Sequence, residues 1–214
     1  GQRTKLVAGG TLPSLSADGS RIAWLESSGV VRLNLTTGQR NQISQDIADR
    51  APGISHTGEQ VAYLNHQALY VWRQGISVRI TQANEDPAWS PDGEWVVYSG
   101  FENRLFKIKI ETDLRPPLEL GVRGMDPAWG SNGKIAFEWE GDIYVVNDGG
   151  SNRRQLTTGP AADSDPAWSP DGSKLVFVSD RDGNPDLYVI NADGGNLRRL
   201  TRTPEWESSP SWGQ

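Results

Sequence analysis

The sequence predicts an all-β fold, a β-propeller made of four-stranded antiparallel blades. Three observations carry this prediction. A pattern of residues recurs about every 40 positions along the chain, a period typical of propeller blades. Each copy holds four short apolar runs separated by turn residues, and no segment shows a sustained apolar pattern at helical spacing. Four-stranded sheets arranged radially bury both faces against their neighbours, which this pattern requires.

The clearest copy is the last one. It begins with Asp165-Pro-Ala-Trp168-Ser-Pro-Asp171-Gly172 and ends with Leu197-Arg-Arg-Leu-Thr201. Between them, residues 175–178 show the alternation of a strand, and the fully apolar run 187–190 fits a strand covered on both faces. The Asp-Gly pair predicts a tight turn because both residue types tolerate positive φ.

Five copies are recognisable, at approximately 12–50, 51–85, 86–125, 126–164 and 165–204. One apolar position recurs in each copy and once more after the last, occupied by Leu15, Ile54, Trp89, Trp129, Trp168 and Trp212. We expect these side chains in matching interior positions, as core rather than as ligand-stacking residues. At 214 residues, with no low-complexity linker, residues 1–214 are expected to form a single propeller domain.

The two ends do not complete a whole number of repeats. Residues 3–7 resemble a fourth strand and residues 209–213 resemble a first strand, with no second or third strand between them. The alternatives are a five-bladed ring with spare end strands, a six-bladed ring with an incomplete blade, and a fragment of a longer protein. We favour five blades. Open blade edges would also allow pairing with a second copy of the chain, as a dimer.

Composition narrows the function. The formal net charge of −6 and the pI of about 5.0 argue against a nucleic-acid partner. The chain has no cysteine, so it has no disulfide frame, thiol nucleophile or thiolate metal site. It contains no apolar run long enough for membrane insertion and no signal peptide, and it begins at Gly1 rather than Met, which leaves a secreted origin open.

The Asp-Pro-Ala-Trp-Ser-Pro-Asp-Gly pattern with its Arg-Arg-Leu-Thr ending closely resembles the WD-like repeat of the TolB family of propellers. The loop Ser179-Asp-Arg-Asp-Gly-Asn184 is also similar to that family's second-to-third strand loop. The resemblance is strong over 86–204 and weak over 12–82. It implies a periplasmic or other extracytoplasmic setting in the bacterial envelope and a role in binding proteins. Similar propellers also occur as non-catalytic domains of serine peptidases, which provides an alternative interpretation.

The candidate site is one end of the ring. In a four-stranded blade, the loops that enter the first strand and those that join the second to the third strand lie at the same end. The partner-binding residues predicted there are Asp49, Asp86, Asp126, Asp165, Trp206 and Glu207. Their charge would attract a basic peptide segment or a cation, and Trp206, which breaks the repeat, would be a contact residue. The structural alternative is that each Asp before Pro accepts backbone N–H bonds of its own turn.

Neither a cofactor nor a metal is expected. The alternating Asp180, Asp182, Asn184 and Asp186 are similar to a calcium loop, but the glycine follows only two of them, so an ordinary hairpin loop is favoured. No catalytic residue is predicted, because His56 and His66 should lie at opposite ends of one blade and no Gly-x-Ser-x-Gly elbow occurs. Plentiful carboxylates leave a carbohydrate hydrolase as the other alternative. The favoured function is a non-catalytic scaffold that binds a protein or peptide.

Overall fold

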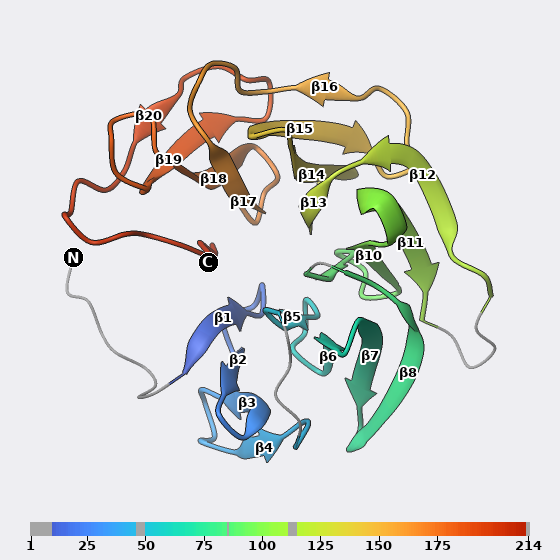
Figure 1. The fold of residues 1–214 in the computed structure, drawn as a ribbon. Coiled ribbons are helices and arrows are strands. Elements are labelled where there is room, and N and C mark those ends of the chain that lie inside the picture. The colour runs from blue at the N-terminus through green and yellow to red at the C-terminus, as the bar shows by residue number, and fades with distance from the viewer. Residues whose placement is uncertain (1–9, 46–49, 85, 111–114, 213–214) are drawn as a thin grey trace.

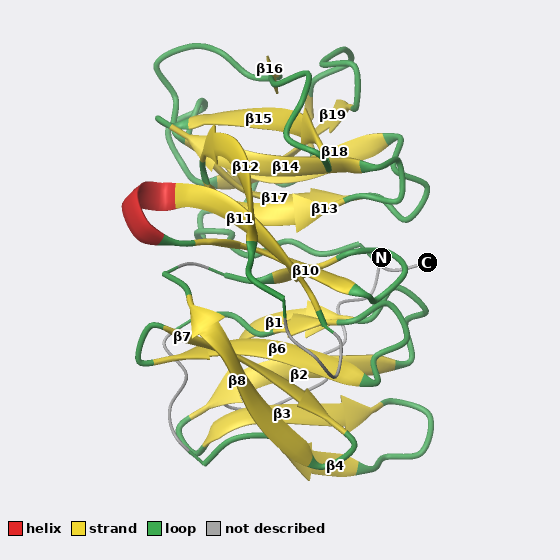
Figure 2. Ribbon diagram, turned by 90° about the vertical axis from the view of Figure 1, so that its right-hand side faces the viewer, coloured by secondary structure: helices red, strands yellow, loops and turns green. Residues whose placement is uncertain are grey.

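Five four-stranded antiparallel sheets lie side by side around a common centre in the computed structural model, which describes residues 10–45, 50–84, 86–110 and 115–212 (Figure 1). This confirms a five-bladed β-propeller, and the described residues include only one helical turn, η1 (Phe101–Asn103). Seen from the side, strands make up nearly all of the regular structure (Figure 2).

Each sheet is a meander in which consecutive strands pair. The strands are β1 (Thr11–Leu15), β2 (Arg21–Glu26), β3 (Gly29–Asn34) and β4 (Arg40–Gln42); β5 (Gly53–Ile54), β6 (Gln60–Asn65), β7 (Ala68–Arg73) and β8 (Ile76–Gln82); β9 (Ala88–Trp89), β10 (Trp95–Ser99), β11 (Arg104–Lys109) and β12 (Leu118–Arg123); β13 (Met125–Trp129), β14 (Lys134–Trp139), β15 (Asp142–Asn147) and β16 (Arg154–Gln155); β17 (Asp163–Trp168), β18 (Lys174–Ser179), β19 (Asp186–Asn191) and β20 (Arg198–Arg199).

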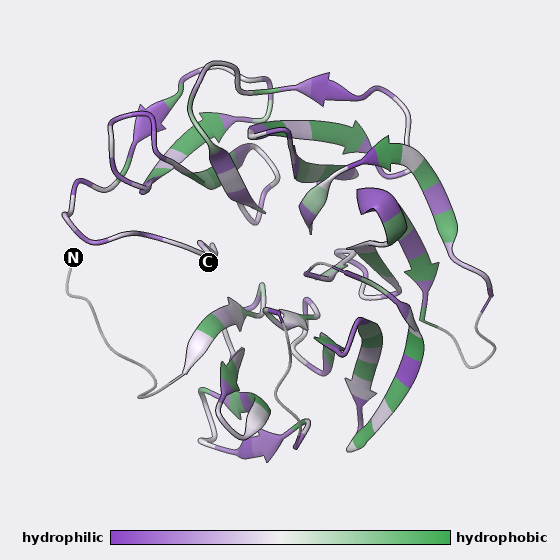
Figure 3. Cartoon of the chain, in the orientation of Figure 1, coloured by the Kyte–Doolittle hydropathy of each residue, from purple (hydrophilic) through white to green (hydrophobic). Residues whose placement is uncertain are grey.

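The core lies between adjacent blades. One apolar cluster joins Ala136 and Val145 of the fourth blade to Phe177 and Ile190 of the fifth, and similar clusters join the first to the second and the second to the third. The outer strands β4, β16 and β20 are short and hydrophilic (Figure 3). Burial of both faces of the middle strands explains why their sequences are almost continuously apolar.

The recurring tryptophans connect one blade to the next. The indole Nε1 of Trp89 donates to the carbonyl oxygen of Gly53 at 3.1 Å, and the indole Nε1 of Trp168 donates to that of Ala128 at 3.2 Å. Trp212 repeats the same bond to Ala167, also at 3.1 Å. The expectation of matching positions is therefore confirmed for these three, and the reason is a hydrogen bond as well as packing volume.

The chain after β20 supplies a sixth inner segment. It runs back towards the centre between the fifth and the first blade (Figure 1), and Ser209 and Trp212 bond to Asp165 and Ala167 of β17. Residues 209–212 thus occupy the position of a first strand without being paired into a described sheet. Residues 3–7 and 213, which we expected to act as end strands, lie outside the described residues.

The Ser-Pro-Asp-Gly sequence builds a second recurring contact. Ser169 donates to Asp171 at 2.6 Å, and the same carboxylate accepts the backbone N–H of Ser173 at 3.0 Å, while Gly172 takes the predicted positive φ of 68°. These hydrogen bonds, with that from Ser169 first, lower the pKa of Asp171 to about 2. Asp18, bonded to Ser16 and Ser20, likewise has a pKa of about 2.

Ser169→Ala is expected to raise the pKa of Asp171 from about 2 towards its ordinary value of 3.8, because the main hydrogen bond to the charged form is lost. Since the folded-state pKa is depressed, the stabilisation is complete above pH 3.8 and is lost as the pH falls towards 2. A carboxyl NMR titration measures the change, with Asp18 as the internal control. An unchanged Asp171 titration would contradict the assignment.

Candidate functional site

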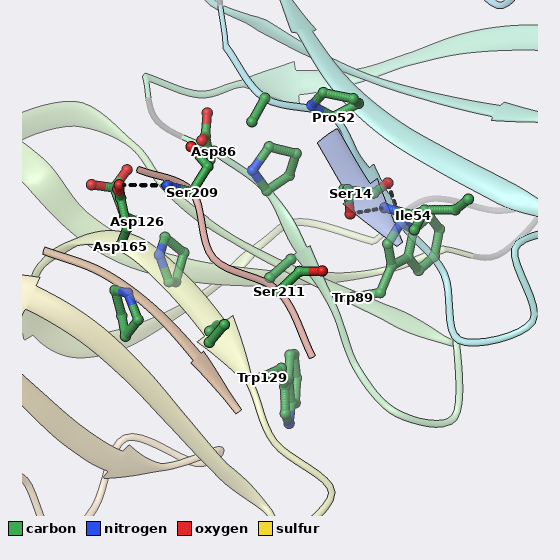
Figure 4. Close-up of a pocket in the computed structure, with 18 of the residues that line it drawn as sticks. Ser14, Pro52, Ile54, Asp86, Trp89, Asp126, Trp129, Asp165, Ser209 and Ser211 are labelled. Atoms are coloured by element: carbon green, nitrogen blue, oxygen red, sulfur yellow. Dashed lines mark hydrogen bonds between the residues drawn. The ribbon is translucent and has the colours of Figure 1, made fainter. Parts of the chain in front are cut away.

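The Asp-Pro-Ala-Trp repeat forms the wall of a central channel. A cavity of about 270 Å³ opens at one end of it, lined by one segment from each of the five blades and by Ser209, Pro210 and Ser211 (Figure 4). In every segment a proline is followed by a small residue: Pro13-Ser14, Pro52-Gly53, Pro87-Ala88, Pro127-Ala128, Pro166-Ala167 and Pro210-Ser211. The rigid prolines and small side chains keep the channel open at this level.

Three predicted carboxylates meet at this cavity. Asp86, Asp126 and Asp165 each precede a lining proline, on three consecutive blades (Figure 4). On the other side of the ring, Ala51 and Ser209 occupy the equivalent positions. The acidic residues therefore lie along one arc of the opening. We call this opening, with Asp86, Asp126 and Asp165 at its edge, the channel mouth.

The backbone at the mouth is unusual. Asp126, Asp165 and Ser209 have φ values of 46°, 51° and 47°, in the left-handed region that Asp tolerates better than most residues. The Asp165 carboxylate accepts the backbone N–H of Ser209 at 3.1 Å, a bond to the next inner segment. The structural alternative, in which each Asp before Pro caps its own turn, does not describe this bond of Asp165, because the N–H that it accepts comes from a segment 44 residues away.

A second cavity, of about 210 Å³, continues the channel beyond the ring of small residues. Trp89, Trp129, Trp168 and Trp212 contribute to its lining, and His56 lies among them. His66 lies in the turn between β6 and β7, with a φ of 49°, and lines neither channel cavity. The two histidines are therefore apart, as expected.

Trp206 and Glu207 lie on a loop outside the channel. The backbone N–H of Glu207 donates to Pro185 O at 3.0 Å, and the side chain of Asn184 donates to Thr203 O and Glu205 O, both at 3.1 Å. This loop is thus attached to the β18–β19 loop, and Trp206 is 81% exposed. Asp49, the remaining predicted residue, lies outside the described residues.

Arginines neutralise many of the other carboxylates at this end. Arg40 pairs with Glu26 at 2.6 Å, and Arg199 contacts both Asp182 and the fully buried Asp186. Both arginines lie on outer strands, and their long side chains reach carboxylates at the ends of the neighbouring strands. Of the predicted carboxylates, Asp86, Asp126 and Asp165 line the cavity.

The carboxylates of the alternating acidic loop make contacts within the chain. Asp180 accepts the backbone N–H of Ala162 at 2.8 Å, Asp182 accepts the hydroxyl of Tyr188 at 2.6 Å, and Asp186 binds Arg199. Among the described residues no group of three or more His, Cys, Asp and Glu side chains is arranged to hold a metal ion. The residues that the structure describes also include no helix long and apolar enough to cross a membrane.

Comparison with known proteins identifies the propeller. A family model described as the TolB beta propeller domain matches residues 74–214, more than half of the chain. The chain belongs to the TolB β-propeller family. A TolB homolog of Chlorobium luteolum is 37% identical over 107 residues, and the Tol-Pal system protein TolB of Bordetella pertussis is 35% identical over 121 residues. These matches span 46% and 51% of this chain, but only 24% and 27% of the relatives' own lengths.

Solved structures support the same fold. The alignment with the crystal structure of TolB from Acinetobacter baumannii spans 96% of this chain and 57% of the TolB chain, with a TM-score of 0.78 at 18% identity. An oligogalacturonate lyase in complex with manganese covers 90% of this chain and 65% of its own, with a TM-score of 0.63, also at 18% identity. At this identity the likeness shows the fold alone, and this fold carries both TolB proteins and a lyase.

Proposed function

We propose that this TolB-family propeller is a non-catalytic scaffold whose channel mouth binds a basic, extended segment of a partner protein. The observation that carries the proposal is the meeting of Asp86, Asp126 and Asp165 around one cavity of about 270 Å³. The curated relatives named as Tol-Pal system proteins support a protein partner and an extracytoplasmic location.

The geometry suits a peptide better than a small substrate. Apart from the three carboxylates, the lining consists mainly of proline and small side chains, which offer backbone hydrogen-bonding groups and a shape suited to an extended chain. An extended chain can enter the opening and contact several inner segments at once. The acidic arc would set the orientation of its basic side chains and raise its association rate. Trp206, exposed on the nearby loop, would provide an aromatic contact at the rim.

The test compares two synthetic peptides, one of alternating Lys and Ala and one of alternating Glu and Ala. The variant D86N/D126N/D165N is expected to slow association of the basic peptide about tenfold or more at low salt and to flatten its salt dependence. Asparagine keeps the side-chain shape and tolerates positive φ, so the mouth geometry is retained.

The matched control removes three charges at the other end of the blades, in the variant E94Q/D148N/D193N. It is expected to bind the basic peptide almost as the unmodified chain does. Equal association rates for both triple variants would show that the total charge, not the mouth, attracts the peptide, and the proposal would then be abandoned.

A further inference from the structure

A third cavity, of about 360 Å³, lies between the second and third blades. It is lined by both blades, and its principal residues are Gln67, Asn84, Tyr98, Gly100, Phe101 and Phe106. Tyr98 and Phe106 are stacked with ring centroids 5.8 Å apart, and Phe101 is 77% exposed. Asn84 precedes the mouth residue Asp86 by two positions, so this cavity adjoins the channel mouth along the chain.

The fifth blade shows what occupies the equivalent place there. Phe177 and Tyr188 form the corresponding stacked pair, 6.1 Å apart, and the guanidinium carbon of Arg181 lies 5.7 and 5.0 Å from their centroids. Arg181 also donates two hydrogen bonds, of 2.8 and 2.9 Å, to the buried carboxylate of Asp163. Stacking and a paired acceptor together hold a planar guanidinium.

The third blade has the same frame without the arginine. Asn84 stands where Asp163 stands, two residues before an Asp-Pro pair. Gly100, the first residue after β10, stands where Ser179 ends β18. A Cβ built on Gly100 would lie 2.9 Å from Cε2 of Phe106, so the glycine leaves the ring face uncovered. The Asn84 Nδ2 donates to Gly100 O at 2.9 Å, which fixes the amide with its carbonyl oxygen as an acceptor.

We propose that this cavity is a socket for the guanidinium group of an arginine side chain from a partner protein, held as Arg181 is held in the fifth blade. The ring of Phe106 provides the stacking face, the amide oxygens of Asn84 and Gln67 accept hydrogen bonds, and Phe101 covers the aliphatic stem. The inference that the partner is basic rests on the proposed function. The chemistry of the socket rests on the comparison of the third blade with the fifth.

The test uses N-acetyl-arginine methylamide as the probe and N-acetyl-lysine methylamide as its matched control. NMR shifts of the Asn84 side-chain amide and of the Gly100 backbone amide are followed during titration. We expect saturable binding of the arginine probe and at least about fivefold weaker binding of the lysine probe. The ammonium group is not planar, so it cannot lay a flat face on the ring while donating hydrogen bonds at its edge. Equal binding of the two probes, or no shift at either amide, would overturn the proposal.

Two variants locate the site. Phe106→Leu keeps an apolar side chain of similar bulk but removes the stacking face, and it should weaken the arginine probe about fivefold. Arg181→Ala opens a second socket above Asp163, and the probe should then shift signals of the fifth blade and raise the melting temperature. If Phe106→Leu leaves binding unchanged, the socket is wrongly assigned. If Arg181→Ala gains no site while remaining folded, the comparison between blades is wrong.

The outcomes separate this inference from the proposed function. The mouth variant D86N/D126N/D165N should still bind the arginine probe in the socket, because none of its changes lines that cavity. Loss of peptide binding with retained probe binding supports both ideas. Retained probe binding with peptide association that does not depend on the mouth sinks only the proposed function.

Discussion

Replacing Trp168 with alanine is expected to destabilise the propeller by about 3–5 kcal/mol, among the largest effects of any single change in the chain. The indole is 8% exposed and packs with Phe177 and Leu175 in the cluster between the fourth and fifth blades. Its removal leaves a cavity and also leaves Ala128 O without the indole N–H that lies 3.2 Å away. Such a loss is a large part of the roughly 5–15 kcal/mol that stabilises a typical domain.

Chemical denaturation of two control variants separates the contributions. Trp168→Phe keeps most of the packing but not the donor, and should cost about 1–2 kcal/mol. Trp206→Ala, at a side chain that is 81% exposed, should leave the free energy of unfolding nearly unchanged. A Trp168→Ala variant as stable as Trp206→Ala would show that the repeated tryptophans do not join the blades.

The repeat made the fold predictable because its physical cause is local. The apolar runs, the Asp-Gly turns and the recurring tryptophan position are all visible within about 40 residues, and each blade needs the same solution to the same packing problem. The hydrogen bonds that explain the pattern were not visible. Trp168 reaches Ala128 and Trp212 reaches Ala167 across blade boundaries, so only the assembled ring shows why the residue is tryptophan rather than phenylalanine.

The location of the candidate carboxylates was predictable in outline and not in detail. The position of Asp86, Asp126 and Asp165 before a proline in three copies places them at one end of the ring, and the structure gathers them at one cavity. The Ser209 N–H that Asp165 accepts lies 44 residues away, which no local pattern shows. The role of Arg181 was not predictable, because its partner Asp163 lies 18 residues away and the aromatic pair comes from two different strands.

The Leu-Thr sequence that follows the fourth strands also has a structural cause that no local pattern shows. The hydroxyl of Thr201 accepts the backbone N–H of Leu187 at 2.8 Å and donates to Asp186 at 3.1 Å, and Thr157 accepts the N–H of Ile143 in the fourth blade. The repeated Leu-Thr ending therefore attaches the outer strand to the start of the third strand. This contact also links the outer strand to a buried carboxylate.

Replacing Arg199 with alanine is expected to destabilise the fold by about 3 kcal/mol, because it removes the cation from a carboxylate that cannot reach water. Asp186 is fully buried, and its Oδ2 contacts Nη2 of Arg199 while its Oδ1 accepts from Thr201. One hydroxyl cannot compensate an isolated buried charge. Thermal and denaturant unfolding of the variant measure the loss.

The double variant Arg199→Ala/Asp186→Asn tests the cause. Asparagine keeps the acceptor for Thr201 but carries no charge, so the second change should recover a substantial part of the stability lost with Arg199. Arg40→Ala is the control, because it removes an arginine from Glu26, a carboxylate whose side chain is 21% exposed. This change should cost less than about 1 kcal/mol, as expected for an ion pair at the surface. If the double variant were less stable than Arg199→Ala alone, the penalty would lie in lost packing of the arginine stem, and the buried charge would not explain why the pair is present.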